Sequence, residues 1–78
     1  MNLKDKLSEV KKKYPIGVYD KKGHYRVKVV SHKIETHNNK QEVVISLYYT
    51  NNPNSSKHQF GLSGKFIALF MNGYKLIK

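Results

Sequence analysis

Residues 25–49 read YRVKVVSHKIETHNNKQEVVISLYY, and their alternation of apolar and polar side chains decides the fold. The clearest strand covers residues 42–49, where every second residue from Val43 to Tyr49 is large and apolar. This is the pattern of a β-strand with one buried face. The opposite face also carries Val44 and Tyr48, so we expect this strand to lie inside the sheet, covered in part on both faces.

The preceding strand changes its phase midway. Its apolar residues fall at odd positions up to Val29 and at even positions from Val30 onward. A β-bulge between Val29 and Ser31 would restore the alternation, and bulges bend strands into curved sheets. Residues 37–40 then read HNNK, and Asn tolerates the left-handed backbone that a tight hairpin turn requires.

The N-terminal segment has helical spacing. Its apolar residues recur at intervals of four, three and four positions, namely Leu3, Leu7, Val10 and Tyr14. Asn2 is a suitable N-cap, and Pro15 ends the helix by disfavouring helical geometry at the residue before it. The period then becomes that of a short strand over residues 16–20, followed by a tight turn in which Gly23 supplies positive φ.

The C-terminal third is less regular. Residues 51–56, NNPNSS, predict a surface loop. A short strand is expected over residues 58–62, and Ser63 could cap a helix over residues 64–71. An Asn-Gly pair ends this helix, and residues 74–77 return as a final strand.

The expected architecture is a single small α+β domain over residues 1–78. It comprises an N-terminal helix, a curved antiparallel sheet of four to five strands with enough curvature for a small open barrel, and a short C-terminal helix before the last strand. The chain has 78 residues and no cysteine, which removes disulfides, thiolate metal sites and a thiol nucleophile. With neither an apolar run of membrane length nor a signal-peptide pattern, we expect a cytoplasmic protein without membrane contact.

Positive charge is the feature with most functional content. The 15 Lys and Arg residues outnumber 5 Asp and Glu residues, giving +10 at pH 7, and Arg26 is the only arginine. Lysine is a point charge that suits attraction to a phosphate backbone more than base reading. We therefore predict a small module that binds nucleic acid with little sequence preference, DNA or RNA, single-stranded or duplex. The competing explanation is the Lys and Asn bias of an AT-rich genome.

The candidate contact residues combine basic side chains with an aromatic one on neighbouring strands and turns. They are Lys21, Lys22, Arg26, Lys28, Lys33 and Tyr48, with Tyr25 as a second stacking residue. Lysines would follow the backbone while bases stack on the tyrosines. The competing explanation for Tyr48 is ordinary strand packing, because Tyr favours strands. The lysine triplet at 11–13 needs no function, since cations suit a helix C-terminus.

The C-terminal helix supports an alternative function. Its apolar residues exceed what one helix face needs, so it is either deeply buried or carries a surface for a partner. The alternative is therefore a protein-binding inhibitor or accessory factor of the phage or bacterial mobile-element type, acting on a nucleic-acid-handling protein. We expect Phe66 and Phe70 in the core, and assign Ile67 and Met71 to the partner surface, with Met71 at its exposed margin.

No sequence pattern indicates an enzyme, a metal site or a cofactor. A metal-independent nuclease remains an alternative, because a His or Tyr base beside a cation could suffice; its candidates are His24, Tyr25, Arg26 and His58. His32 and His37 are five positions apart and would face opposite sides of a regular strand, so they do not predict a shared metal.

Overall fold

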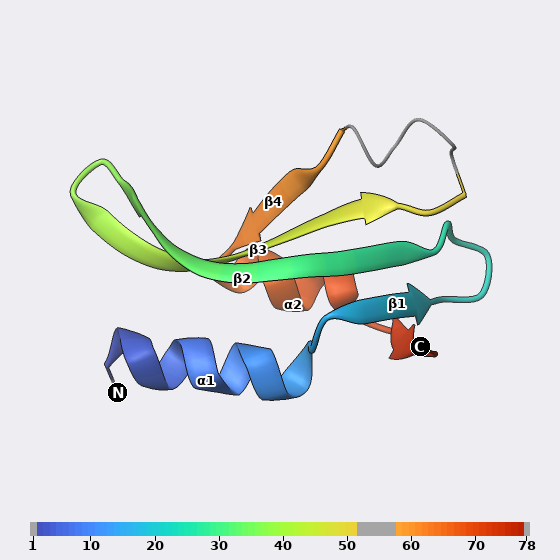
Figure 1. Ribbon diagram of the computed structural model, residues 1–78, viewed down its shortest axis with the longest axis horizontal. Helices are drawn as coiled ribbons and strands as arrows, with labels where there is room; N and C mark the ends of the chain where they lie inside the picture. Colours follow the sequence, from blue (N-terminus) through green and yellow to red (C-terminus); the bar gives the residue numbers. More distant parts are fainter. Residues whose placement is uncertain (1, 52–57, 78) are drawn as a thin grey trace.

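The computed structural model describes residues 2–51 and 58–77 (Figure 1). Its elements run in the order α1 (Leu3–Lys13), β1 (Gly17–Asp20), β2 (Val27–His37), β3 (Lys40–Tyr49), β4 (Phe60–Ser63), α2 (Lys65–Met71) and β5 (Lys75–Leu76). This order confirms the predicted α+β fold, including the N-terminal helix and the short helix before the last strand. The predicted loop at 51–56 lies, apart from Asn51, outside the described residues.

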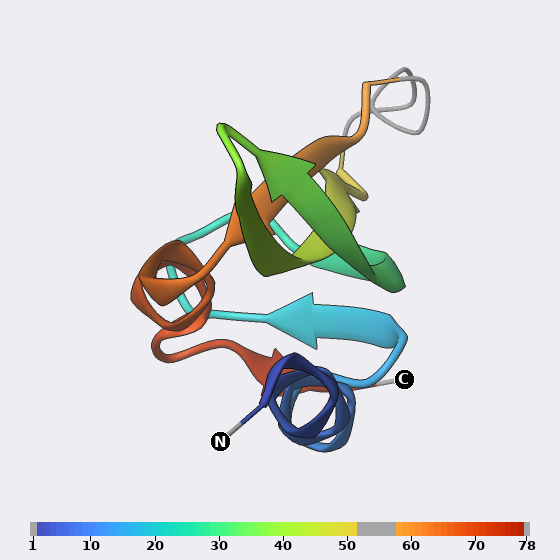
Figure 2. The ribbon, with the colours of Figure 1, turned by 90° about the vertical axis from the view of Figure 1, so that its left-hand side faces the viewer.

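The five strands form one open antiparallel sheet in the order β4-β3-β2-β1-β5. The last strand thus returns to pair with the first, and β3 is an internal strand, as its two partly apolar faces predicted. Figure 2 shows that the strands wrap around the interior instead of lying in one plane. This curvature brings the ends of strands that are distant in sequence close to one another.

The bulge and the hairpin turn are both where the sequence predicts them. The pairing of β2 with β3 shifts register between Val29, opposite Leu47, and Ser31, opposite Ser46. At the turn, Asn38 and Asn39 have φ of 50° and 64°. Both asparagines therefore adopt the left-handed conformation that a two-residue hairpin turn requires.

The core lies between the concave face of the sheet and α2. Its buried residues come from β1, β2, β3 and α2, and are Tyr19, Val27, Val29, Ile45, Leu47, Ile67 and Met71. The Tyr19 hydroxyl donates to the Pro15 carbonyl at 2.6 Å. Burial, together with the neighbouring Tyr14, raises the pKa of Tyr19 to about 12, so the phenol stays protonated at neutral pH.

Hydrogen bonds mark both ends of helix α1. Its N-cap is Asn2, whose side-chain oxygen accepts from the Asp5 N–H at 2.9 Å, as predicted. At the other end, Nε2 of His32 lies 2.5 Å from the Tyr14 carbonyl oxygen and links the helix to β2. No residue of α1 is fully buried, although Val10 packs against the core. Within the described residues, no helix is long and apolar enough to span a membrane.

The predicted orientation of α2 is wrong. Ile67 and Met71 are 4% and 2% exposed, whereas Phe66 is 55% exposed and Phe70 is half-buried. The members of each pair are four residues apart, and each buried residue directly follows a predicted core residue in the sequence. The buried side of the helix is therefore rotated by about 100° from the predicted one. Burial of Ile67 and Met71 leaves neither side chain accessible, so they do not form the partner surface assigned to them.

The predicted start of α2 is also wrong. Ser63 belongs to β4, and the N-cap is Gly64, which makes no side-chain capping bond. Gly64 has φ of 54°, a conformation that β-branched and most other residues avoid. The helix therefore begins after a glycine with positive φ, and not at a serine cap.

Candidate nucleic-acid interface

A cleft of about 800 Å³ lies at the end of the sheet. We call it the aromatic cleft. Its walls come from the β1–β2 turn, the end of β3, the outer side of α2 and the segment after α2. The lining residues are Lys21, Gly23, His24, Tyr25, Tyr49, Asn51, Leu69, Phe70 and Tyr74.

Aromatic rings form a continuous series along the cleft. The centroid of the Tyr49 ring lies 6.0 Å from that of Tyr25 and 5.4 Å from that of Phe60. Phe60 contacts Phe70 edge to face at 5.6 Å, and Phe70 stacks on Tyr74 at 5.7 Å with an interplanar angle of 10°. Such arrangements are favourable for aromatic pairs. One end of the series is open, because Tyr25 is 67% exposed.

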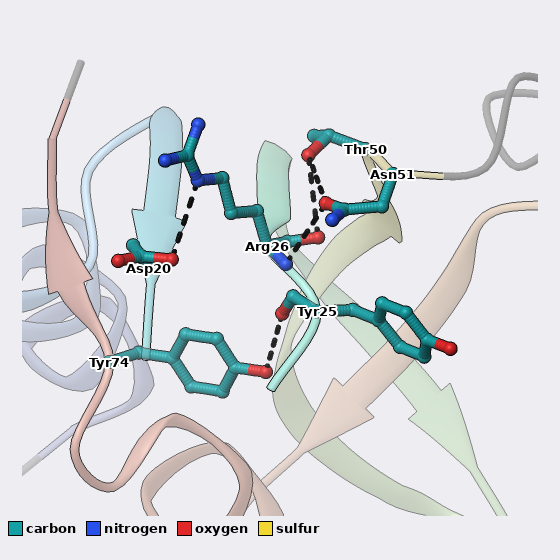
Figure 3. Close-up of polar contacts among 6 residues, drawn as sticks. All are labelled: Asp20, Tyr25, Arg26, Thr50, Asn51 and Tyr74. Atoms are coloured by element: carbon teal, nitrogen blue, oxygen red, sulfur yellow. Dashed lines mark hydrogen bonds and ion pairs between the residues drawn. The ribbon is translucent and has the colours of Figure 1, made fainter. Parts of the chain in front are cut away.

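Hydrogen bonds from both sides fix the backbone at Tyr25 and Arg26 (Figure 3). The Tyr74 hydroxyl donates to the Tyr25 carbonyl at 2.9 Å. The Thr50 N–H donates to the Arg26 carbonyl at 2.9 Å, and the Arg26 N–H donates to the side-chain oxygen of Asn51 at 3.2 Å. Hydrogen bonds from Tyr74 and from residues 50–51 therefore hold the backbone that carries the exposed Tyr25 ring.

The phenol of Tyr74 is suited to this role. Burial raises the pKa of Tyr74, and the neighbouring Tyr49 and Asp20 raise it further. The hydroxyl consequently keeps its proton at neutral pH and continues to donate to the Tyr25 carbonyl.

Lys21 supplies a cation at the wall of the cleft. Its ammonium lies 5.8 Å from the centroid of the Tyr74 ring, within the range of a cation–π contact. Its alkyl chain crosses Gly73, where an added Cβ would lie 3.1 Å from Lys21 Cε. Gly73 also has φ of 86°. Glycine at this position thus makes room for the lysine as well as ending the helix.

The other predicted contact residues lie elsewhere. Lys28 and Tyr48 are directly opposite each other on β2 and β3, on the face of the sheet that points away from the core. On this outer face, Arg26 Nε is 3.3 Å from Asp20 Oδ1, and Lys33 Nζ is 3.5 Å from Glu35 Oε2. Lys22 is exposed in the β1–β2 turn.

The predicted set is therefore divided between two surfaces. Only Lys21 and the second stacking candidate, Tyr25, line the aromatic cleft. Tyr49 and Tyr74, which sequence reasoning assigned to strands, complete it. The available signal was their position, since Tyr49 is the last residue of β3 and Tyr74 directly precedes β5.

The candidates for nuclease chemistry are not all at one place. His24 and Tyr25 line the cleft, and the His24 ring lies 6.3 Å from that of Tyr74. Arg26 instead pairs with Asp20 on the outer face, and His58 is not among the lining residues. Among residues 2–51 and 58–77, no three His, Cys, Asp or Glu side chains form a group suited to a metal.

No family model, curated protein or solved structure matches this chain.

Proposed function

We propose that this protein binds single-stranded nucleic acid in the aromatic cleft. The observation that carries the proposal is Tyr25, whose ring is 67% exposed on a hydrogen-bonded backbone and lines the same cleft as the ammonium-bearing Lys21. A base can stack on an exposed aromatic ring, while a lysine beside it contacts the phosphate. Both groups occur here within one depression.

The cleft favours a single strand over a duplex. Stacking on Tyr25 requires the face of a base, and that face is covered by neighbouring base pairs in a helix. Unpaired bases can turn outward and insert between aromatic side chains, which is how many single-strand-binding proteins work. DNA and RNA both offer such bases, so the stacking contact does not distinguish them.

The remaining charge supports attraction to a polyanion. The chain carries +10 at pH 7, and Lys22 is exposed in the same turn as Lys21. Lys28 on the outer face lies near the same strand ends. We propose that these lysines attract the backbone without reading sequence, because they are flexible point charges.

Replacing Lys21 with Gln is expected to lower the salt dependence of binding. A lysine that neutralises one phosphate of a single strand contributes about 0.7 to the slope of log affinity against log salt. The slope of the variant should therefore be shallower by about 0.7. Fluorescence anisotropy of labelled single-stranded and duplex DNA and RNA at rising salt would measure it.

Lys33→Gln is the matched control for this experiment. It removes the same charge from the outer face, where Lys33 already pairs with Glu35. We expect its slope to equal that of the natural protein. An unchanged slope for Lys21→Gln would mean that Lys21 does not contact a phosphate. Absence of binding to all four nucleic acids at low salt would refute the proposed function.

A second candidate function is binding of a protein partner through α2. The corrected orientation of the helix exposes Phe66 and Leu69, at 55% and 67%. They are three residues apart and share one side of the helix, where Lys65 lies 5.7 Å from the Phe66 ring. Capture from a lysate with and without nuclease would separate the functions: partners retained after nuclease, and lost in Phe66→Ala, favour this one.

A further inference from the structure

We propose that the bound strand continues from the aromatic cleft past Tyr74 into a second depression, where Lys13 contacts a phosphate. This inference rests on the proposed function, since it concerns the path of the strand whose base stacks on Tyr25. It gives a role to one lysine of the triplet at 11–13, for which the helix C-terminus alone is a sufficient explanation in the sequence.

The second depression has a volume of about 420 Å³ and lies where the end of α1 meets the segment after α2 (Figures 1 and 2). The end of α1 contributes Lys13 and Tyr14 to its lining, and the segment after α2 contributes Asn72, Gly73 and Tyr74. An ammonium group, an amide and two phenols therefore surround it, and these groups suit a polar ligand.

The second depression adjoins the aromatic cleft. Tyr74 lines both of them. Lys21 lines the aromatic cleft, and its alkyl chain crosses Gly73, which lines the second depression. A strand that leaves the aromatic cleft beside Tyr74 can therefore pass directly into the second depression, with Lys21 at the boundary.

The two depressions present the same combination of side chains. In the second depression, the Lys13 ammonium lies 5.7 Å from the centroid of the Tyr14 ring. In the aromatic cleft, the Lys21 ammonium lies 5.8 Å from the centroid of the Tyr74 ring. Within residues 2–51 and 58–77, neither lysine forms an ion pair with an Asp or Glu side chain. Both ammonium groups can therefore donate hydrogen bonds to a phosphate oxygen.

The contact assigned to the second depression is with the backbone of the strand. Tyr14 is half-buried, whereas Tyr25 is exposed, so Tyr14 offers less of its ring to a base. Lys13 is exposed and carries the positive charge. We therefore assign one phosphate contact, and no stacked base, to this part of the path.

Lys13→Gln tests the path, and Lys12→Gln is its matched control. Both variants remove one positive charge from the last turn of α1, so both change the net charge and the helix C-terminus in the same way. Lys12, however, is not among the residues that line either depression. A difference between the two variants therefore reports where the charge lies and not merely that it is lost.

The measurement is the salt dependence of binding for thymidine oligomers of about 2 to about 16 nucleotides, since small single-strand-binding folds cover about 4–16. For the shortest oligomers, which occupy only the aromatic cleft, we expect the same slope of log affinity against log salt in Lys13→Gln and Lys12→Gln. Once the strand is long enough to reach the second depression, the slope of Lys13→Gln should become shallower by about 0.7. Lys21→Gln should instead have a shallower slope at every length.

Equal slopes for Lys13→Gln and Lys12→Gln at every length would overturn the inference and leave the proposed function intact. A difference already present with the shortest oligomer would also overturn it, because Lys13 would then belong to the first contact and not to a longer path. No binding of any oligomer would refute the proposed function, and this inference with it. Thermal melts would verify that each variant is folded.

Discussion

Replacing Met71 with Ala is expected to destabilise the protein by about 2–5 kcal/mol. Met71 is 2% exposed and belongs to the cluster that joins α2 to the sheet. Truncation removes buried methylene and thioether groups and leaves a cavity that the surrounding strands can fill only in part. A domain of this size has a total stability of about 5–10 kcal/mol, so the change removes a large share of it.

Phe66→Ala is the matched comparison on the same helix. Phe66 is larger than Met71 but 55% exposed, so its loss should change the free energy of unfolding by no more than about 0.5–1 kcal/mol. Thermal and urea melts followed by circular dichroism would measure both variants. The described packing of α2 would be refuted if Phe66→Ala proved as damaging as Met71→Ala.

Replacing Tyr25 with Ala is expected to weaken binding of single-stranded oligonucleotides about tenfold or more. The ring is 67% exposed, and in the proposed function it is the surface on which a base stacks. Each stacked base contributes about 1–3 kcal/mol. Tyr25→Phe should retain the affinity, because stacking needs the ring and not the hydroxyl. Anisotropy titration at constant salt would measure the three proteins.

Tyr48→Ala controls for the general loss of a tyrosine. Tyr48 lies on the outer face opposite Lys28, away from the cleft, and we expect its replacement to leave affinity within twofold of the natural value, roughly 0.4 kcal/mol. The reverse result, with Tyr48→Ala weakening binding and Tyr25→Ala neutral, would assign the nucleic acid to the outer face of the sheet.

Local chemistry explains which parts of the fold could be predicted. The Asn38-Asn39 turn, the Asn2 cap and the bulge after Val29 each depend on a few consecutive residues whose backbone preferences are strong. The sequence of β3 predicted an internal strand, because a strand covered on both faces carries apolar residues at successive positions and not only at every second one.

Packing over long sequence distances explains what could not be predicted. In α2, the pairs Phe66/Phe70 and Ile67/Met71 both form an apolar stripe, and helical spacing alone does not say which one meets the sheet. The structure buries the aliphatic pair. Phe70 instead turns toward Phe60, a residue of β4.

The aromatic cleft was missed for a related reason. Its lining rings come from the β1–β2 turn, β3, α2 and the segment after α2, which are far apart in the sequence. Tyr49 lies on the same face of β3 as the buried Leu47, so alternation predicts Tyr49 as a core residue. It is the last residue of the strand, however, and 36% of it is exposed. Adjacent Tyr48, the predicted stacking residue, faces the other way.

The most direct test of the aromatic cleft as the nucleic-acid interface is a nuclear magnetic resonance titration. Protein labelled with ¹⁵N would be titrated with a single-stranded thymidine oligomer at low salt, and the backbone amide shifts followed residue by residue. We predict that the largest changes fall at residues 21–25, 49–51 and 69–74, which surround the cleft. Changes confined to Lys28, Lys33 and Tyr48 on the outer face, or no changes at saturating oligomer, would contradict it.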